Sequence, residues 1–325
     1  MTRVFITGGA GFIGYFITKE LLAKGHDVII YDAFLNYVPP LKSRYMHCLE
    51  YRLNDIKNDA EIIRGDIRHR GLLIKTLSDT KPDIVIHLAA IPIASASNEF
   101  SEDAMQINLN GTVTLLECLR VSSSVKRFVF ASSSFVYGNF KHEPANEEHS
   151  TNPIDIYGGT KLSGEVLTKA FGKKFGIDYT IIRPSAVYGP TDANRRVSEI
   201  FMEGALTQKP LILNNEGKEK IDFTYVTDTA HGFILAAFSE NAKNETFNIT
   251  RGEGKTIQEF AAILKTFLPE TQIVEKQSSE IRPQRGALDI SKAKKLLDYT
   301  PQFPIEKGIS KYIEFLKEHP KLLHK

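Results

Sequence analysis

The segment VFITGGAGFIGYFITKELLAKGHDVIIYD, residues 4–32, constrains the fold more than any other part of the chain. It opens with a short β-type run at 4–6. Apolar residues at helical spacing follow from Phe12 to Leu21, and a second apolar run covers 28–31. Gly25 is placed to end the helix. The segment therefore predicts a strand, a tight glycine-rich turn, a helix and a second strand.

The glycine-rich turn has the composition of a dinucleotide site. Gly8, Gly11 and Gly14 would let the backbone approach a pyrophosphate, and the helix N-terminus offers N–H groups and a positive dipole. Asp32 ends the second strand, where its carboxylate can accept both hydroxyls of the adenosine ribose. Glycines in such turns also occur for packing alone, but this strand context and Asp32 favour a dinucleotide. Because Asp32 would repel a 2′-phosphate, we expect NAD.

Strands and helices go on alternating beyond this unit. Strand-like runs end near Asp66, at His87 with the small pair Ala89-Ala90, at the serines of VKRFVFASSS, and in DYTIIRPSAVYGP. Asp66 is a candidate for the adenine edge. The pattern predicts an α/β fold, a Rossmann doubly wound parallel sheet with a smaller, interrupted C-terminal lobe. We expect residues 1–185 to form the NAD-binding domain, which also receives about 222–249, and residues 186–325 to be mainly a substrate-binding lobe.

The bulk composition excludes several classes of function. The 325-residue chain has a net charge of +2 without a basic stripe, so neither nucleic acid nor a membrane surface is expected as a partner. No apolar run approaches the ~18 residues of a membrane span, and we expect no N-terminal leader. Cys48 and Cys118 are the only cysteines and form no zinc spacing. These features predict a cytoplasmic protein without a metal centre.

The stretch YGGTK places Tyr157 and Lys161 four positions apart at the start of a predicted helix, on one face. A phenol has a pKa near ~10, and we expect a nearby ammonium and an oxidised nicotinamide to lower it. Ser133, at a strand end, could hydrogen-bond the same substrate oxygen. Tyr and Lys at this spacing are common on solvated helices. Their place after a dinucleotide site favours removal of a hydroxyl proton while hydride leaves the same carbon.

The ordered motifs TGGAGFIG, HLAA, INLNGT, SSSFVYG, YGGTK, RPSAVYGP and DFTYVTD resemble the extended short-chain dehydrogenase/reductases, specifically the NAD-dependent sugar epimerase/dehydratase group. The resemblance runs from residue 3 to about 313. It implies Ser133, Tyr157 and Lys161 as the catalytic residues. For the cofactor it implies Gly8, Gly11, Phe12, Ile13, Gly14, Asp32, Asp66, Ile67, His87, Leu88, Ala89, Ala90, Asn108, Tyr157, Lys161 and Pro184.

The resemblance also indicates which reaction to expect. Relatives that dehydrate sugars follow the catalytic Ser/Thr with Asp-Glu, and decarboxylating relatives tend to carry an acidic residue there, whereas this chain has Ser134 and Phe135. Since Phe135 cannot move a proton, we expect redox-neutral epimerisation of a UDP-hexose or UDP-uronate through a 4-keto intermediate. The alternatives are a dehydratase or decarboxylase with an acid from elsewhere, a net dehydrogenase, and a non-catalytic NAD-binding regulator.

The substrate side is less regular. Arginines at 195, 196, 282 and 285 and a lysine at 220 could contact a diphosphate, although such charges are usually solvated. The RPxR setting of Arg282 resembles the diphosphate-binding arginine of relatives. We take Ser134, Arg195, Arg196 and Arg282 as substrate-binding candidates. Relatives usually carry Asn and Arg where this chain has Ala186 and Ile221, which puts the usual diphosphate contacts in doubt.

Two further expectations concern assembly and the segment after Asp32. In relatives, helices corresponding to about 100–120 and 157–172 pair with their copies in a second subunit, so the resemblance implies a homodimer. The segment AFLNYVPPLKSRYMHCLEYRLNDIKND has no assigned role and is expected to form an enlarged loop plus a helix beside the adenosine.

Overall fold

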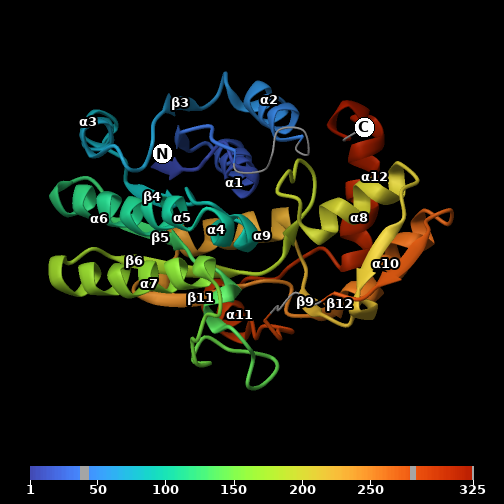
Figure 1. Cartoon of the computed structure of the whole chain (residues 1–325). Helices are drawn as coiled ribbons and strands as arrows, with labels where there is room; N and C mark the ends of the chain where they lie inside the picture. Colours follow the sequence, from blue (N-terminus) through green and yellow to red (C-terminus); the bar gives the residue numbers. More distant parts are fainter. Residues whose placement is uncertain (37–43, 279–282, 324–325) are drawn as a thin grey trace.

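The structure, a computed structural model, describes residues 1–36, 44–278 and 283–323. Its centre is a seven-stranded parallel sheet with the order β11-β6-β5-β4-β1-β2-β3 (Figure 1). The strands are β1 (Arg3–Thr7), β2 (Asp27–Asp32), β3 (Glu61–Arg64), β4 (Ile84–His87), β5 (Arg127–Ala131), β6 (Tyr179–Pro184) and β11 (Glu245–Ile249). The order reverses direction between β1 and β4, which confirms the predicted doubly wound sheet.

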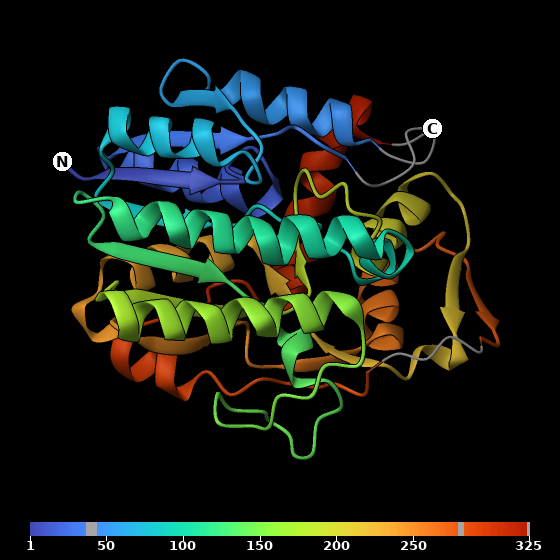
Figure 2. The ribbon, with the colours of Figure 1, turned by 60° about the vertical axis from the view of Figure 1, so that its left-hand side comes forward.

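Helices cover both faces of this sheet because the strand side chains alternate between two apolar cores. Val4 and Ile6 point to the core shared with α1 (Phe12–Ala23) and α9 (Val226–Phe238). Phe5 points to the opposite core. That core is closed by α3 (Arg70–Thr80), α6 (Gly111–Val121) and α7 (Ile156–Phe175). In Figures 1 and 2, α6 and α7 run side by side along the outside of the sheet.

The chain leaves the sheet after β6, builds a second lobe, and returns with α9 and β11. The lobe has its own apolar core, to which Phe201, Phe260 and Tyr312 contribute. Its helices are α8 (Val197–Leu206), α10 (Ile257–Phe267) and α12 (Ile305–Glu318), while α11 (Ser291–Leu297) packs beside β11. Its short strands, which form three two-stranded pairs, are β7 (Val187–Tyr188), β8 (Leu211–Asn214), β9 (Lys220–Asp222), β10 (Thr224–Tyr225), β12 (Gly254–Thr256) and β13 (Ile273–Lys276).

Between β2 and β3 lies α2 (Tyr45–Ile56), so the helix expected in the unassigned segment is present. The helix bridges the two lobes. The Tyr51 ring lies 6.5 Å from the Tyr15 ring of α1 and 5.4 Å from the Phe315 ring of α12, in both cases edge-on. Short helices α4 (Ala94–Glu99) and α5 (Ser101–Ala104) and a π-helical turn precede α6.

Within the ranges given above, the helices are too short or too polar to cross a membrane. In the same ranges, His, Cys, Asp and Glu side chains do not gather in a group that could hold a metal ion.

Candidate active site

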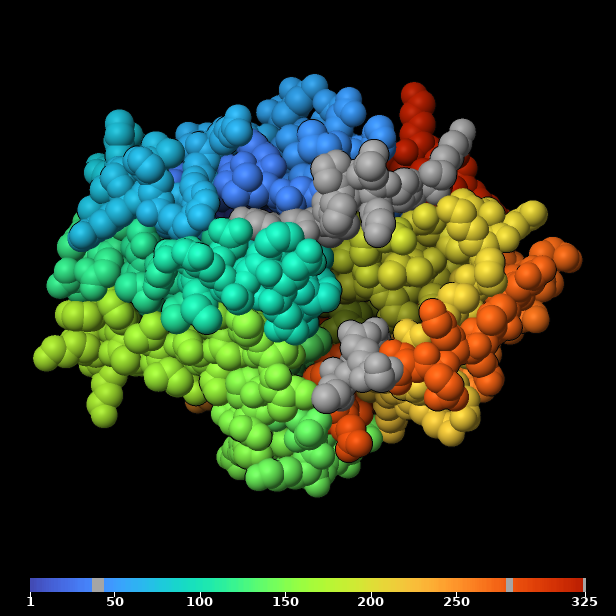
Figure 3. Space-filling model, in the orientation of Figure 1, coloured from blue at the N-terminus to red at the C-terminus, as the bar shows by residue number. Residues whose placement is uncertain are grey.

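A cavity of about 660 Å³ lies at the carboxyl ends of the central strands, between the sheet and the second lobe. Residues that follow β1, β2, β4, β5 and β6 line one side of it. Segments 193–198, 219–223 and 283–285 contribute the other side. In the space-filling view of Figure 3, the surface is hollowed between the teal segment and the yellow segment of the lobe. This is the position at which doubly wound sheets bind ligands.

The glycine-rich turn forms one wall, and two of its glycines are required sterically. Gly8 has a φ of 71°, and a Cβ there would lie 2.7 Å from the amide nitrogen of Ala89. A Cβ on Gly14 would lie 2.5 Å from the Gly8 carbonyl oxygen. Gly11 caps α1 and lines the cavity with the other two. The turn therefore presents bare backbone and a helix N-terminus to the cavity, as a pyrophosphate requires.

Two carboxylates extend this wall. One Asp32 oxygen accepts from the backbone N–H of Ala10 at 3.1 Å and the other accepts from Phe34 at 2.8 Å. Burial raises the pKa of Asp32, against these bonds. Asp66 accepts from the Arg68 guanidinium at 2.6 Å, which holds its pKa below the usual value. Both carboxylates and Ile67 line the cavity. A carboxylate at the end of β2 suits the ribose of NAD and disfavours a 2′-phosphate.

Three predicted catalytic residues meet at the end of β5. Asp155 caps α7 by accepting from the N–H of Gly158 at 2.7 Å, and one turn later Tyr157 and Lys161 face the same cavity. The Lys161 ammonium donates to the carbonyl of Ala131, the last residue of β5, at 2.8 Å. Ser133 follows that strand and hydrogen-bonds Tyr157. The helix cap and the β5 carbonyl thus fix the triad from two elements.

Burial and the neighbouring charge of Arg196 act in opposite directions on the pKa of the Tyr157 phenol. Burial raises the pKa of Tyr157, and Arg196 together with the Ser133 hydrogen bond counteracts this rise. Lys161 lies 5.9 Å from the centroid of the Tyr157 ring. Burial lowers the pKa of Lys161 itself to about 8. We expected Lys161 and an oxidised nicotinamide together to lower the pKa of Tyr157. In the protein alone, burial raises this pKa and Arg196 is the cation that counteracts the rise, so the combined effect stays a prediction.

Ser134 and Phe135, which follow Ser133 directly, both lie in the cavity wall. The Phe135 ring meets the Tyr157 ring edge-on at 5.6 Å, and the Arg285 guanidinium lies 4.2 Å from the other side of Phe135. The Ser134 hydroxyl donates to Ser185 at 3.2 Å. All of these residues line the cavity. The second position after Ser133 therefore carries an aromatic ring against the candidate base, and not a carboxyl group.

Two cofactor candidates do not belong to the part of the cavity wall that the structure describes. His87 is buried between Thr7 and Thr112, at 2.7 and 2.9 Å, and burial lowers its pKa to about 3. The Asn108 amide accepts from the N–H of Ile91 at 2.7 Å and donates to Thr160 at 3.2 Å. Both residues brace the segments behind the wall. The wall itself includes the remaining cofactor candidates, Phe12, Ile13, Leu88, Ala89, Ala90 and Pro184 among them.

The substrate candidates have mixed positions. Arg195 and Arg196 line the cavity. The Arg195 guanidinium is bound by the carboxylate of Glu203, whereas Arg196 donates to the carbonyl of Pro92 at 3.1 Å. Arg282 lies outside the described residues.

Several wall residues were missed by the sequence analysis. Arg52 of α2 lines the cavity although the segment had no assigned role. A signal existed, because Arg52 shares the buried face of α2 with Cys48, Leu49 and Ile56, and a charge on an apolar face needs a partner. Asn194 and Asp155 also line the cavity. An Asp before a predicted helix is a recognisable cap, whereas Asn194 sits in an irregular loop without a pattern.

Comparison with known proteins agrees with this site. The NAD dependent epimerase/dehydratase family matches residues 4–250. A Bacillus subtilis protein named an uncharacterized UDP-glucose epimerase is 32% identical over 97% of this chain and 98% of its own length. The structure of Thermotoga maritima UDP-glucose 4-epimerase with UDP-glucose superposes with a TM-score of 0.89 at 29% identity, covering 98% of this chain and 99% of that one. Bacillus cereus UDP-glucuronic acid 4-epimerase, solved with UDP-glucuronic acid and NAD, gives the same values.

These matches extend across the sheet and the second lobe alike, and they confirm both the resemblance seen in the sequence and NAD as the cofactor. The chain is an enzyme that belongs to the NAD-dependent epimerase/dehydratase family.

Proposed function

We propose that this protein is a nucleotide-sugar 4-epimerase that acts on a UDP-hexose or a UDP-uronate through a transient 4-keto sugar. The observation that carries the proposal is the arrangement of Ser133, Tyr157 and Lys161 around one cavity, with Phe135 where an acid for elimination would be needed. The epimerases of Thermotoga maritima and Bacillus cereus, which share the fold at a TM-score of 0.89, support it.

The glycine-rich turn, Asp32 and Asp66 would hold the adenosine diphosphate half of NAD. Gly8 and Gly14 leave no room for a side chain between the turn and its neighbours, and Asp32 would accept the ribose hydroxyls. When bound, NAD supplies a reversible hydride acceptor. We assign the remaining cofactor contacts to the wall residues Phe12, Ile13, Ile67, Leu88, Ala89, Ala90 and Pro184. His87 and Asn108 would support the segments behind this wall.

Tyr157 would accept the proton of the sugar 4-hydroxyl and later return it. Its pKa is raised by burial, so it needs nearby positive charge to work as a base near neutral pH. Lys161 and Arg196 are placed to supply part of that charge. The Ser133 hydroxyl would hydrogen-bond the same sugar oxygen and hold it in line with the phenol.

Elimination is disfavoured by the groups that share the cavity. Among the described residues that line it, the acidic ones are Asp32, Asp66, Asp155 and Glu219. The first two belong to the cofactor wall, Asp155 caps α7, and Glu219 pairs with Arg285 at 3.4 Å. Epimerisation needs only one base and one hydride carrier, because the proton and the hydride that leave the sugar both return to it.

The test uses the purified protein with NAD⁺ and four substrates: UDP-glucose, UDP-galactose, UDP-glucuronate and UDP-galacturonate. Product NMR should show interconversion within one of these pairs, approached from both sides, without NADH accumulation. Steady NADH formation would instead identify a net dehydrogenase. Loss of water or of carbon dioxide, seen by mass spectrometry, would identify a dehydratase or a decarboxylase. No turnover with bound NAD would favour a regulator.

We also propose that residues 186–325 mainly form the substrate lobe, with the diphosphate near Arg195, Arg196 and Arg282, and Ser134 near the sugar. A homodimer in the cytoplasm is proposed on the family resemblance. Its support here is that α6 and α7 lie side by side and carry exposed apolar side chains, Val121, Val166 and Phe175. Light scattering during size-exclusion chromatography should give twice the chain mass, and Val166→Lys should halve it.

A further inference from the structure

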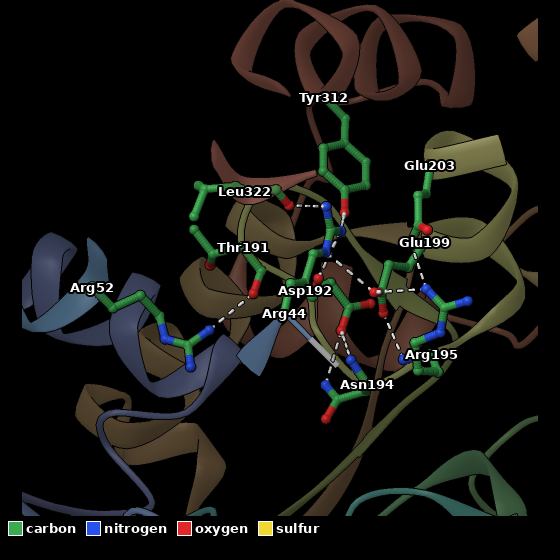
Figure 4. Close-up of polar contacts among 10 residues, drawn as sticks. All are labelled: Arg44, Arg52, Thr191, Asp192, Asn194, Arg195, Glu199, Glu203, Tyr312 and Leu322. Atoms are coloured by element: carbon green, nitrogen blue, oxygen red, sulfur yellow. Dashed lines mark hydrogen bonds and ion pairs between the residues drawn. The ribbon is translucent and has the colours of Figure 1, made fainter. Parts of the chain in front are cut away.

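Helix α2 carries two buried arginines that reach into the other half of the molecule. Arg44 is 2% exposed and Arg52 is 1% exposed. Both donate to the backbone of the loop between β7 and α8, Arg52 to the Thr191 carbonyl at 2.9 Å and Arg44 to the Asp192 carbonyl at 2.9 Å (Figure 4). Two adjacent carbonyls of the lobe are thus held from a helix that belongs to the sheet half.

Arg52 also holds the glycine-rich turn. Its Nε donates to the Ala10 carbonyl at 2.9 Å, while the Ala10 N–H donates to Asp32 at 3.1 Å. One guanidinium therefore joins the carbonyl of a cofactor-turn residue to the carbonyl of Thr191. Because both acceptors are backbone atoms, a movement of the turn would act through Arg52 on the backbone of the loop.

The loop needs to be held, since its backbone is strained. Thr191 has a φ of 66° and Arg195 a φ of 56°, in the left-handed region that a β-branched residue such as Thr rarely adopts. The Thr191 hydroxyl and one Asp192 carboxylate oxygen are also buried without a hydrogen-bond partner among the described residues. This conformation carries Asn194, Arg195 and Arg196 into the cavity wall.

Arg44 anchors the same loop to the rest of the lobe. It donates to Glu199 of α8 at 3.2 Å, to the hydroxyl of Tyr312 in α12 at 2.7 Å and to the carbonyl of Leu322 at 2.6 Å. Figure 4 shows these groups converging on Arg44, while Arg52 approaches the adjacent residue Thr191 from the other side. Arg44 thus fixes the Asp192 carbonyl to the lobe, and Arg52 ties the adjacent Thr191 carbonyl to the cofactor turn.

We propose that Arg52 is a positioning residue that couples NAD binding at the glycine-rich turn to the conformation of residues 189–196, and so sets the substrate wall. The identity of the substrate rests on the function proposed above, whereas the coupling itself involves only NAD and this chain. Without the guanidinium, binding of NAD at the turn would no longer fix the strained loop. Asn194 and Arg196 would then spend less time in the position that contacts the substrate.

The test is amide hydrogen exchange measured with and without NAD⁺ on the whole protein. NAD⁺ should slow exchange at residues 8–14 and at 189–196 of the wild type, where the N–H groups of Asn194 and Arg195 are hydrogen-bonded to carboxylates. In Arg52→Lys, which keeps the charge but reaches one carbonyl only, NAD⁺ should still protect 8–14 but not 189–196. Arg127→Met is the control, since Arg127 is a buried arginine that donates to the Ser239 carbonyl at 3.0 Å, outside the cavity wall. It should keep both effects.

A second variant guards against a fold defect. Arg52→Lys should raise the substrate KM by about tenfold, within the usual 5- to 150-fold range of coupling between sites. Thr191→Gly removes the backbone strain, so adding it to Arg52→Lys should reverse most of this rise. The proposal is overturned if NAD⁺ leaves 189–196 unaffected in the wild type, if Arg52→Lys keeps the wild-type protection, or if Thr191→Gly rescues nothing. Failure of the proposed function would appear separately, as absent UDP-sugar turnover with the exchange pattern intact.

Discussion

The two sides of the cavity are built by different means. On the cofactor side, the contacts are made by backbone and by residues at strand ends. The positive φ of the glycine-rich turn falls on Gly8. Asp32 accepts from the N–H of Phe34, two residues on, and from the N–H of Ala10 in the turn after the adjacent strand β1. On the substrate side, positive φ values fall on Ala186, Thr191 and Arg195, and an ion pair joins Arg285 to Glu219, 66 residues away in the chain. The cofactor side relies mostly on glycines and backbone groups at strand ends, with Arg52 as a distant support, whereas the substrate side relies on strained non-glycine residues and side-chain contacts.

Tyr157 lies where the two sides meet, and its removal should have the largest effect. In Tyr157→Phe, kcat should fall by about 10²–10⁴-fold, the usual contribution of a general base, because the ring remains but the proton acceptor is lost. NAD affinity, measured by calorimetry, should stay within about threefold, an effect below ~1 kcal/mol. Turnover close to that of the wild type would remove Tyr157 from the mechanism.

Gly14→Ala tests the cofactor side alone. The added Cβ would lie 2.5 Å from the Gly8 carbonyl and 2.7 Å from Gly9 Cα, so the turn must move away from its place. Overpacking of this kind costs about 1–3 kcal/mol, and we expect NAD affinity to drop by about 10- to 100-fold. Gly71→Ala is the matched control, since its Cβ would meet only the His69 ring at 3.9 Å. NAD affinity should be unchanged there, and an equal loss in both variants would contradict the steric argument.

This contrast also explains how much the sequence could predict. The glycine turn, Asp32 and the spacing of Tyr157 and Lys161 followed from patterns within a few residues, and the doubly wound sheet followed from the alternation of strands and helices along the chain. The support from Arg52, the strained Thr191, and the change in the Tyr157 pKa did not, because each depends on burial or on partners more than 100 residues away, as Arg52 and Thr191 are. Motif resemblance placed His87 and Asn108 in the site; both are buried and lie outside the cavity wall that the structure describes, so their contact with the cofactor stays a prediction.

Asp222 of β9 binds the segment that follows β11, and its titration should be visible in stability. It accepts from Thr250 after β11 at 2.9 Å and from the N–H of Leu288 at 3.1 Å, yet burial raises its pKa to about 7. The folded state therefore holds a proton that the unfolded state loses near pH ~4. Its stabilising contribution is full at low pH and lost as pH rises through about 7. Between pH 5 and 7 the free energy of unfolding of wild type relative to Asp222→Asn should fall by about 2 kcal/mol, measured by urea denaturation. A pH-independent difference would mean that Asp222 is ionised throughout.

The smallest effect is expected from Arg285→Met, which tests the side-chain packing of the substrate side. The guanidinium lies 4.2 Å from the Phe135 ring, whose edge meets Tyr157, and it pairs with Glu219 at 3.4 Å. Methionine keeps the apolar contact but removes the charge, so it loses a cation–π contact of about 0.5–2 kcal/mol and leaves Glu219 less compensated before an anionic substrate. KM should rise by about 3- to 10-fold with kcat nearly unchanged, because neither the base nor the hydride carrier is touched. Lys307→Met is the control, as Lys307 lies 4.3 Å over the Phe303 ring away from the cavity wall. Equal changes of KM in both variants would mean that the effect is not specific to Arg285. If Arg285→Met lowered kcat instead, the charge would act on the chemistry and not on binding, and the separation between the two sides would not hold at this point.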